Sequence, residues 1–337
     1  TKKINNQLSL TKQYIDDNYL TNDILTLELE VNSQLKSVTM IPRGEIGRVK
    51  MKRNDEILLV PDGFKPLKEC MAILVNVTEI KECNNKTPWY TKAIYTSNKQ
   101  LLVTDFSNKI FYILDSSYDI VCIHKFPGSP FDICMVYGEI VATTLPLKKS
   151  IHLLSLKDKV ITYKKQIQTK YRCFGIAAYN HEDLIVSGPI GDGNMYYWSI
   201  ITLEGKEKSY HEFKGTGNNQ TYVALNALKT RLYISVWADC SLHCFGLDGM
   251  KHFTFTHQSL KGSQGVSVDR DDNVYVVGSR SHNIFQLYSD GFLIQVILNG
   301  IEKIPMGLCF NQDGDTFALT HVTDTALSFY GLDYKDK

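Results

Sequence analysis

Long apolar runs, closely paired cysteines and catalytic signatures are all missing from this sequence. No run of about 18 apolar residues occurs, so the sequence predicts no membrane-spanning helix. Neither a Gly-x-Ser-x-Gly nucleophile elbow nor a His-Glu-x-x-His zinc motif is present. These absences leave the chain without a familiar hydrolase or metalloprotease signature.

A charge excess of either sign is also lacking. Lys and Arg number 37 against 36 Asp and Glu, so the net charge of +1 does not by itself select a nucleic acid as a partner. Hydrophobic residues make up 43% of the 337-residue chain and charged residues 22%. This balance provides for a packed core and excludes wholesale disorder.

The eight cysteines are dispersed and form no Cys-x-x-Cys pair. Their spacing predicts reduced thiols, mostly buried in strands, in a cytoplasmic protein. It also provides no ladder of paired Cys and His residues of the kind that zinc modules need. Glycosylation sequons at Asn76, Asn85 and Asn219 leave a secreted protein as the alternative.

What the sequence does contain is a repeat. A three-residue apolar segment followed by a second apolar run occurs six times, with partner runs such as "IFYIL", "MYYW" and "IFQL". The spacing between successive segments is 39 to 48 residues. The six segments begin at Leu101, Ile140, Leu184, Leu232, Val274 and Thr316.

Each repeat predicts four short strands in about 42 residues, a length typical of one propeller blade. A unit of this size cannot cover both faces of its own sheet, so neighbouring units must pack against it. Inner strands rich in Gly, Ala and Cys, such as "FGIAAY", suit the crowded axis of a ring. The sequence therefore predicts an all-β fold, a six-bladed β-propeller.

The last repeat ends before its fourth strand. The apolar segment Cys70–Ile80 has no other assignment, and we expect it to pair with the last blade and close the ring. The predicted propeller domain therefore comprises residues 70–334.

The repeats "LLVTDFSNKIFYILD" and "NVYVVGSRSHNIFQLYSDG" resemble NHL-repeat propellers. Asp105, Asn108 and Ile110 match that motif in the first blade, as do Asn283 and Ile284 in the fifth. The segment "LTLELEVNSQLKSVTMIPRGEIGRVKM" is similar to the linker between coiled coil and propeller in invertebrate tripartite-motif proteins. The resemblance covers about residues 25 to 334. It implies that residues 1–60 are an N-terminal linker segment, made of the end of a coiled-coil region and short β structure.

This resemblance implies a protein-recognition propeller, the substrate- or partner-binding region of a tripartite-motif ubiquitin ligase. The zinc-binding RING of such a ligase would lie outside this chain, and homo-oligomers would form through an upstream coiled coil. A propeller that binds single-stranded RNA is the alternative. A propeller hydrolase or lyase is a third class, which the inner strands do not favour.

Some six-bladed propellers are hydrolases or lyases with a metal in the central channel, and that site needs several inward carboxylates or amides at the starts of the inner strands. Only Asp132 stands near such a position. In "CSLHC" an extended backbone places Cys240 and Cys244 on one side and His243 on the other. We therefore expect no catalytic site, no metal site and no cofactor in this chain.

Partner binding is expected on one face of the ring, where the loops between second and third strands and the connections between blades come together. Aromatic and Arg residues dominate recognition hot spots, which makes Trp237 the leading candidate. Its alternative role is packing between blades. The predicted binding residues are Phe106, Lys109, Lys148, Lys149, Arg172, Tyr222, Trp237, Arg280, His282 and Lys303.

One basic run stands out, with eight Lys and Arg residues and a single acid between Pro146 and Arg172. It is either a basic sector that meets an acidic partner or phosphate backbone, or a set of solvated outer strands and turns. Because the whole chain is nearly neutral, the sequence favours a protein ligand over RNA.

Overall fold

The computed structural model describes residues 70–80, 86–157, 160–191, 194–217 and 219–334, together with four short strands nearer the N-terminus. The chain divides into two compact units, Thr1–Lys68 and Glu69–Lys337. In the first unit β1 (Thr26–Leu27), β2 (Ser37–Ile41), β3 (Arg48–Lys52) and β4 (Glu56–Leu59) form one antiparallel sheet. The coiled-coil end expected within residues 1–60 lies outside the described residues, as do Cys83 and the Asn85 sequon.

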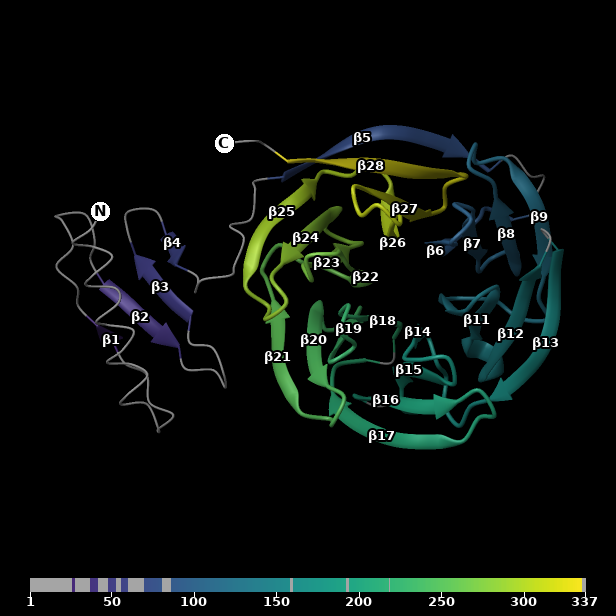
Figure 1. Cartoon of the computed structure of the whole chain (residues 1–337), viewed down its shortest axis with the longest axis horizontal. Coiled ribbons are helices and arrows are strands. Elements are labelled where there is room, and N and C mark those ends of the chain that lie inside the picture. The colour runs from purple at the N-terminus through teal and green to yellow at the C-terminus, as the bar shows by residue number, and fades with distance from the viewer. Residues whose placement is uncertain are drawn as a thin grey trace. The chain divides into compact units, whose positions relative to one another are not determined.

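The second unit is a ring of six four-stranded antiparallel sheets (Figure 1). The first blade contains β6 (Tyr90–Tyr95), β7 (Leu101–Asp105), β8 (Ile110–Leu114) and β9 (Ile120–Lys125). The second contains β10 (Ile133–Tyr137), β11 (Ile140–Leu145), β12 (Ser150–Lys157) and β13 (Val160–Gln168). The third contains β14 (Gly175–Ala178), β15 (Asp183–Pro189), β16 (Met195–Thr202) and β17 (Glu207–Lys214).

The remaining blades repeat the same order of strands. The fourth contains β18 (Thr221–Leu225), β19 (Arg231–Val236), β20 (Ser241–Gly246) and β21 (Lys251–Thr256). The fifth contains β22 (Ser263–Val268), β23 (Val274–Gly278), β24 (Asn283–Leu287) and β25 (Leu293–Asn299). The sixth contains β26 (Ile304–Phe310), β27 (Thr316–Val322), β28 (Ala326–Tyr334) and β5 (Cys70–Glu79). The six-bladed propeller predicted from the sequence is confirmed.

The sixth blade joins the two ends of the propeller unit. Its outermost strand β5 pairs antiparallel with β28, from Ala326 opposite Glu79 to Tyr334 opposite Cys70. Figure 1 shows these strands side by side at the rim of the ring. The segment that the sequence assigned to ring closure therefore occupies the fourth position of the last blade.

Apolar side chains from neighbouring blades form the core between the sheets. Leu102 and Phe111 of the first blade, for example, share a cluster with Leu154 of the second. Buried hydroxyl groups near the ends of the second strands add polar links across these boundaries. Thr144 Oγ1 donates to the Phe174 carbonyl of the next blade at 2.8 Å, and Ser187 and Thr221 hydroxyls lie 2.7 Å apart. Such bonds satisfy backbone and side-chain groups that have no water to bind.

A 3₁₀ turn, η1 (Pro146–Lys148), is the one helical element among the described residues, and none of them forms a helix able to cross a bilayer. The seven described cysteines are free thiols. Four of these cysteines, Cys70, Cys173, Cys244 and Cys309, are buried.

Candidate functional site

The propeller has two faces with different connections. Because each sheet is antiparallel, the loops between second and third strands open on the same side as the connections between blades. We call this side the loop face. The turns between first and second strands and between third and fourth strands lie on the other side, the turn face. All ten binding residues predicted from the sequence belong to the loop face or to the inner strand starts beneath it.

The two faces carry opposite charge. Among the described residues between strands, the loop face has nine basic and four acidic side chains. The basic ones are Lys86, Lys109, Lys148, Lys149, Lys170, Arg172, Lys261, Arg280 and Lys303. The acidic ones are Asp132, Asp239, Glu302 and Asp324.

The turn face has the reverse composition, with four basic and twelve acidic side chains among the described residues. The acidic ones are Asp115, Asp119, Glu139, Glu182, Glu204, Asp248, Asp269, Asp271, Asp272, Asp290, Asp313 and Asp315. Although the total charge is nearly zero, the propeller therefore has a basic face and an acidic face on opposite sides of the ring.

Three of the predicted residues occupy one repeated backbone position. Each is the last residue before a third strand and has a left-handed backbone, with φ of 60° at Lys109, 50° at Lys149 and 53° at His282. Cys240 takes the same position in the fourth blade. The hairpin geometry thus places these side chains at equivalent points around the loop face.

Aromatic rings pack over the axis beneath this face. Phe131 lies 5.0 Å from Phe174 and 4.9 Å from Tyr222, measured between ring centroids. Phe106 lies 5.0 Å from Trp89 and 6.1 Å from Phe131. The Tyr222 hydroxyl donates to the Thr91 carbonyl at 2.9 Å, and the residue is fully buried. Phe106 and Tyr222 therefore contribute to the core beneath the loop face.

Trp237 is half-buried in the loop between β19 and β20, beside the fifth blade. The guanidinium carbon of Arg280 lies 3.9 Å from the centroid of its ring, and Arg280 is exposed. Cys240 stabilises the same loop, since its sulfur accepts from the Gly262 amide at 3.2 Å. The structure thus brings Trp237 and Arg280 together across a blade boundary.

The other basic residues of the predicted set differ in whether they are exposed or bound to a neighbouring group. Lys109, Lys148, Lys149 and Arg172 are exposed. Lys303 forms an ion pair with Asp324 at 2.8 Å. His282 Nδ1 lies 2.7 Å from the Ile301 carbonyl, which ties this side chain to the connection between blades.

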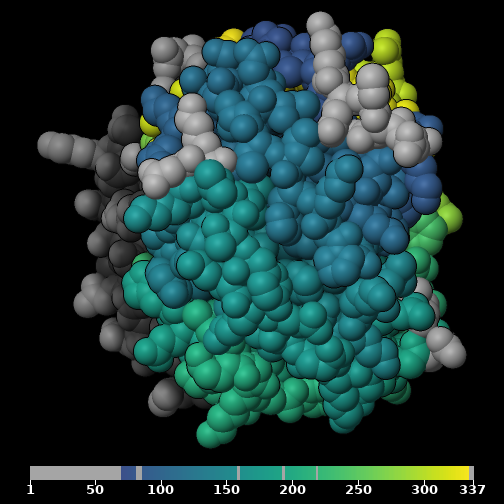
Figure 2. All heavy atoms as spheres, turned by 90° about the vertical axis from the view of Figure 1, so that its right-hand side faces the viewer, coloured from purple at the N-terminus to yellow at the C-terminus, as the bar shows by residue number. Residues whose placement is uncertain are grey.

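The basic run between Pro146 and Arg172 is spread over more than one surface. Lys148 and Lys149 lie on the loop face, whereas Lys165 is in the outer strand β13 and pairs with Glu204 at 3.4 Å. The Nζ atom of Lys170 lies over the Tyr171 ring, 4.9 Å from its centroid. Figure 2 shows the rim of these blades as a closely packed outer surface. Only the part of this run on the loop face contributes to the basic side of the molecule.

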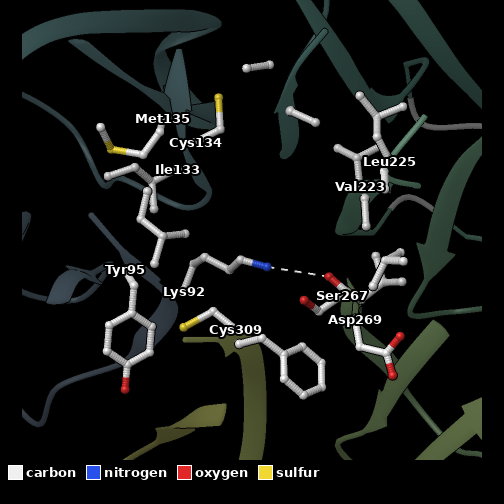
Figure 3. Close-up of a pocket in the computed structure, with 18 of the residues that line it drawn as sticks. Lys92, Tyr95, Ile133, Cys134, Met135, Val223, Leu225, Ser267, Asp269 and Cys309 are labelled. Carbon is white, nitrogen blue, oxygen red and sulfur yellow. Dashed lines mark hydrogen bonds between the residues drawn. The ribbon is translucent and has the colours of Figure 1, made fainter. Parts of the chain in front are cut away.

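A pocket of about 500 Å³ opens on the axis from the turn face, and sequence reasoning missed it. Inner strands and first turns from around the ring line it (Figure 3). Lys92 of β6 points across this pocket and is only 7% exposed. Its Nζ donates to the Leu308 carbonyl at 3.2 Å and the Val266 carbonyl at 3.5 Å. In "YTKAIY" an extended backbone places Lys92 on the same side as Tyr90 and Ile94, and nothing in this local pattern indicates that the lysine faces the axis.

Asp132 is buried between two inner strands. One carboxylate oxygen accepts from the Ile133 amide at 2.9 Å and the other from the Ile176 amide at 3.0 Å. Burial raises the pKa of Asp132 to about 6, against the opposing effect of the Lys92 charge and these two amides. The carboxylate therefore links the second and third blades and supplies the inner edge of β14 with an acceptor.

The side chains of "CSLHC" are engaged in local contacts. His243 Nε2 lies 3.0 Å from the Ser241 hydroxyl and its Nδ1 lies 3.0 Å from the Thr254 hydroxyl. Burial lowers the pKa of His243 to about 3. No group of three or more His, Cys, Asp or Glu residues with metal-binding geometry occurs in the described part of the chain.

Comparison with known proteins places the fold and no more. The chain matches no family model and no curated protein. It is similar to a crystal structure of catalytically inactive virginiamycin B lyase from Staphylococcus aureus with quinupristin, at 12% identity and a TM-score of 0.58, over 76% of this chain and 99% of that one. A streptogramin B lyase structure matches at 12% identity and a TM-score of 0.55, over 77% and 98% of the two chains. A selenomethionine-substituted virginiamycin B lyase from Staphylococcus aureus matches at 14% identity and 0.53, over 78% and 99%.

Proposed function

We propose that this propeller is a protein-recognition module that binds an acidic segment of a partner across its loop face. The observation that carries the proposal is the division of charge, with nine basic against four acidic side chains on this face and the reverse excess on the other. Such a field steers an acidic partner to one side of the ring and repels it from the other.

The arrangement of aromatic rings favours protein over single-stranded RNA. Sequence-tolerant RNA binding uses exposed rings on which bases stack. Here Phe131, Phe174 and Tyr222 are buried over the axis, and Arg280 covers the ring of Trp237. The loop face therefore offers cations and a stacked guanidinium, which suit carboxylates of a peptide.

The wider setting that we propose follows from the sequence resemblance to tripartite-motif proteins. In that setting the propeller holds the substrate of a ubiquitin ligase, and the ligase chemistry belongs to a RING outside this chain. The chain itself would act by binding and not as an enzyme. A cytoplasmic location is part of the same proposal.

Selection from a random peptide library tests the proposed function without a known partner. The native propeller should enrich peptides rich in Asp and Glu. Replacing Lys148 and Lys149 together with Glu should weaken binding of the enriched peptides by at least about tenfold, because exposed charges that steer and pair are reversed. The matched control reverses Lys99 and Lys229 on the turn face and should leave affinity unchanged.

Two results would contradict the proposal. One is enrichment of peptides without acidic residues; the other is an equal loss in the turn-face control. A parallel titration with single-stranded oligouridylate at about 50 mM salt should show no binding. Tight binding there, falling steeply as salt rises, would replace the protein ligand with RNA.

A further inference from the structure

The pocket on the turn face lies on the opposite side of the ring from the proposed partner surface. Its volume of about 500 Å³ falls in the range of small-molecule sites, roughly 300–1,000 Å³. Each inner strand is the end strand of its sheet, so the edge that faces the axis has no sheet partner. The pocket therefore combines apolar side chains with backbone groups that can bind a ligand.

Lys92 is the unusual feature of this pocket. An ammonium group has three N–H donors, and two of them reach the Leu308 and Val266 carbonyls. The Tyr222 ring lies 5.9 Å from Nζ, on the side of the aromatic cluster. Within the described residues, the third donor has no acceptor and no carboxylate lies within ion-pair distance. The nearest interacting carboxylate, Asp132, feels the Lys92 charge but forms no ion pair with it and accepts two backbone amides instead. A buried cation without a contacting anion is costly, which makes an anionic ligand the natural complement.

The other charged groups near the pocket are already engaged. Both Asp132 oxygens accept backbone amides. Asp269 accepts from Asn273 and Tyr275, and its carboxylate points away from Lys92 in Figure 3. Arg270 at the mouth bonds the Gln312 carbonyl at 2.6 Å and lies 3.7 Å from Asp313. Lys92 is thus the cation left for a ligand among the residues that line the pocket.

The walls around Lys92 are apolar. Ile94, Ile133, Met135, Ile176, Val223 and Leu225 contribute to them. Two thiols also line the pocket, but burial raises the pKa of Cys309 to about 12 and that of Cys134 further. These thiols are not nucleophiles at neutral pH. The apolar walls therefore suit non-covalent binding of a ligand.

We propose that this pocket binds a small amphipathic monoanion, with its carboxylate on Lys92 and its apolar body along the inner strands. Such a ligand completes the hydrogen bonds of the ammonium group and removes apolar surface from water. The acidic turns around the mouth select against a second negative charge, because the far end of the ligand would lie among them. The acidic turns therefore exclude nucleotides and dicarboxylates, which carry more than one negative charge. A fatty-acid-like anion, whose far end is uncharged, remains compatible with the pocket.

Calorimetric titration with octanoate, octanol and the dicarboxylate suberate tests this inference on the full chain. Native protein should bind octanoate most tightly, octanol more weakly and suberate least. In Lys92→Met the affinity for octanoate should fall at least about tenfold, while that for octanol stays within about twofold, because only the charge is lost. Lys99→Met, which removes an exposed lysine of the turn face, should bind all three as the native protein does.

A second variant covers the case in which Lys92→Met does not fold. Met135→Trp narrows the pocket and keeps Lys92, so it should weaken octanoate and octanol together. Failure of octanoate to bind native protein, or unchanged octanoate affinity in folded Lys92→Met, would overturn the inference. Neither outcome bears on the loop face, where the peptide selection gives a separate answer.

Discussion

The guanidinium of Arg280 lies 3.9 Å from the ring centroid of Trp237, across the boundary between the fourth and fifth blades. Both residues belong to loops of the basic face, and Arg280 is the exposed partner. The pair therefore presents a cation whose position is fixed by an aromatic ring, and it anchors the ring at the same time.

We expect Trp237→Ala to weaken binding of an acidic peptide by about 2 kcal/mol, because the change also releases Arg280 from its fixed position. Arg280→Ala should cost a similar amount, and the double variant should cost less than the sum of the two. Isothermal titration of the three variants measures this coupling. If Trp237 only packs between blades, its replacement will lower the free energy of unfolding and leave peptide affinity intact.

Deleting residues 1–84 should destabilise the propeller by several kcal/mol. The reason is that β28 would lose β5 along its whole length and expose an unpaired edge. Thermal melting monitors the change, with a deletion of residues 1–68 as the matched control because it leaves β5 in place. Equal melting temperatures for the two truncated chains would show that closure contributes nothing to stability.

The stability of the protein should depend on pH through Asp132. Its folded pKa of about 6 lies above the ordinary value of 3.8, so the native state holds this proton over a range in which the unfolded chain has lost it. The contribution of the Asp132 proton to the free energy of unfolding is therefore fully present below about pH 4 and is lost as pH rises through 6. A shift of this size corresponds to about 3 kcal/mol.

Asp132→Asn removes that titration. Urea unfolding of both proteins between about pH 4 and pH 7 should show the advantage of the native protein shrinking as pH rises. Comparing the two proteins at each pH cancels the contribution of other groups, such as His243. A difference in stability that stays constant over this range would refute the assignment.

The hydroxyl of Thr144 should contribute substantially to the free energy of unfolding. It donates to the Phe174 carbonyl and accepts from the Asp132 amide at 3.0 Å, in a fully buried position. Thr144→Val keeps the shape and leaves both groups unsatisfied, so it should cost about 1–3 kcal/mol. Chemical denaturation measures this, with the exposed Thr162→Val as control; a cost no greater than that of the control would contradict the bridging role.

Much of the fold was predictable because each repeat can be recognised from short apolar segments of the sequence. Each of the six apolar triplets lies in the second strand of a blade, as at Leu101 in β7 and Val274 in β23. The closing segment could be assigned because the sixth repeat lacked one strand. These features depend on the alternation of side chains and on counting, which a single sequence provides.

The site was less predictable because burial in a ring depends on neighbours far apart in the sequence. Phe106 stands in a loop of the loop face and Tyr222 near the start of the inner strand β18, yet packing over the axis half-buries the first and buries the second. Lys92 lies in a short strand whose local pattern does not distinguish the axis from solvent, and only the closing of the ring places it on the axis. The opposed charge of the faces was present in the sequence, but a linear count of charges between residues 146 and 172 could not separate one kind of turn from the other.

Ring closure through β5 has a consequence for how the chain folds. Strand β5, which begins at Cys70, is the first strand of the propeller in the sequence, and its partner β28, which ends at Tyr334, is the last. A ribosome therefore releases the closing strand first and its partner last, and the final ladder must wait for the five blades in between. Long-range pairing of this kind is slow to form, and the sixth blade is expected to be where the ring first opens. Amide hydrogen exchange should accordingly be fastest along β28 and β5 and slowest in the blades opposite.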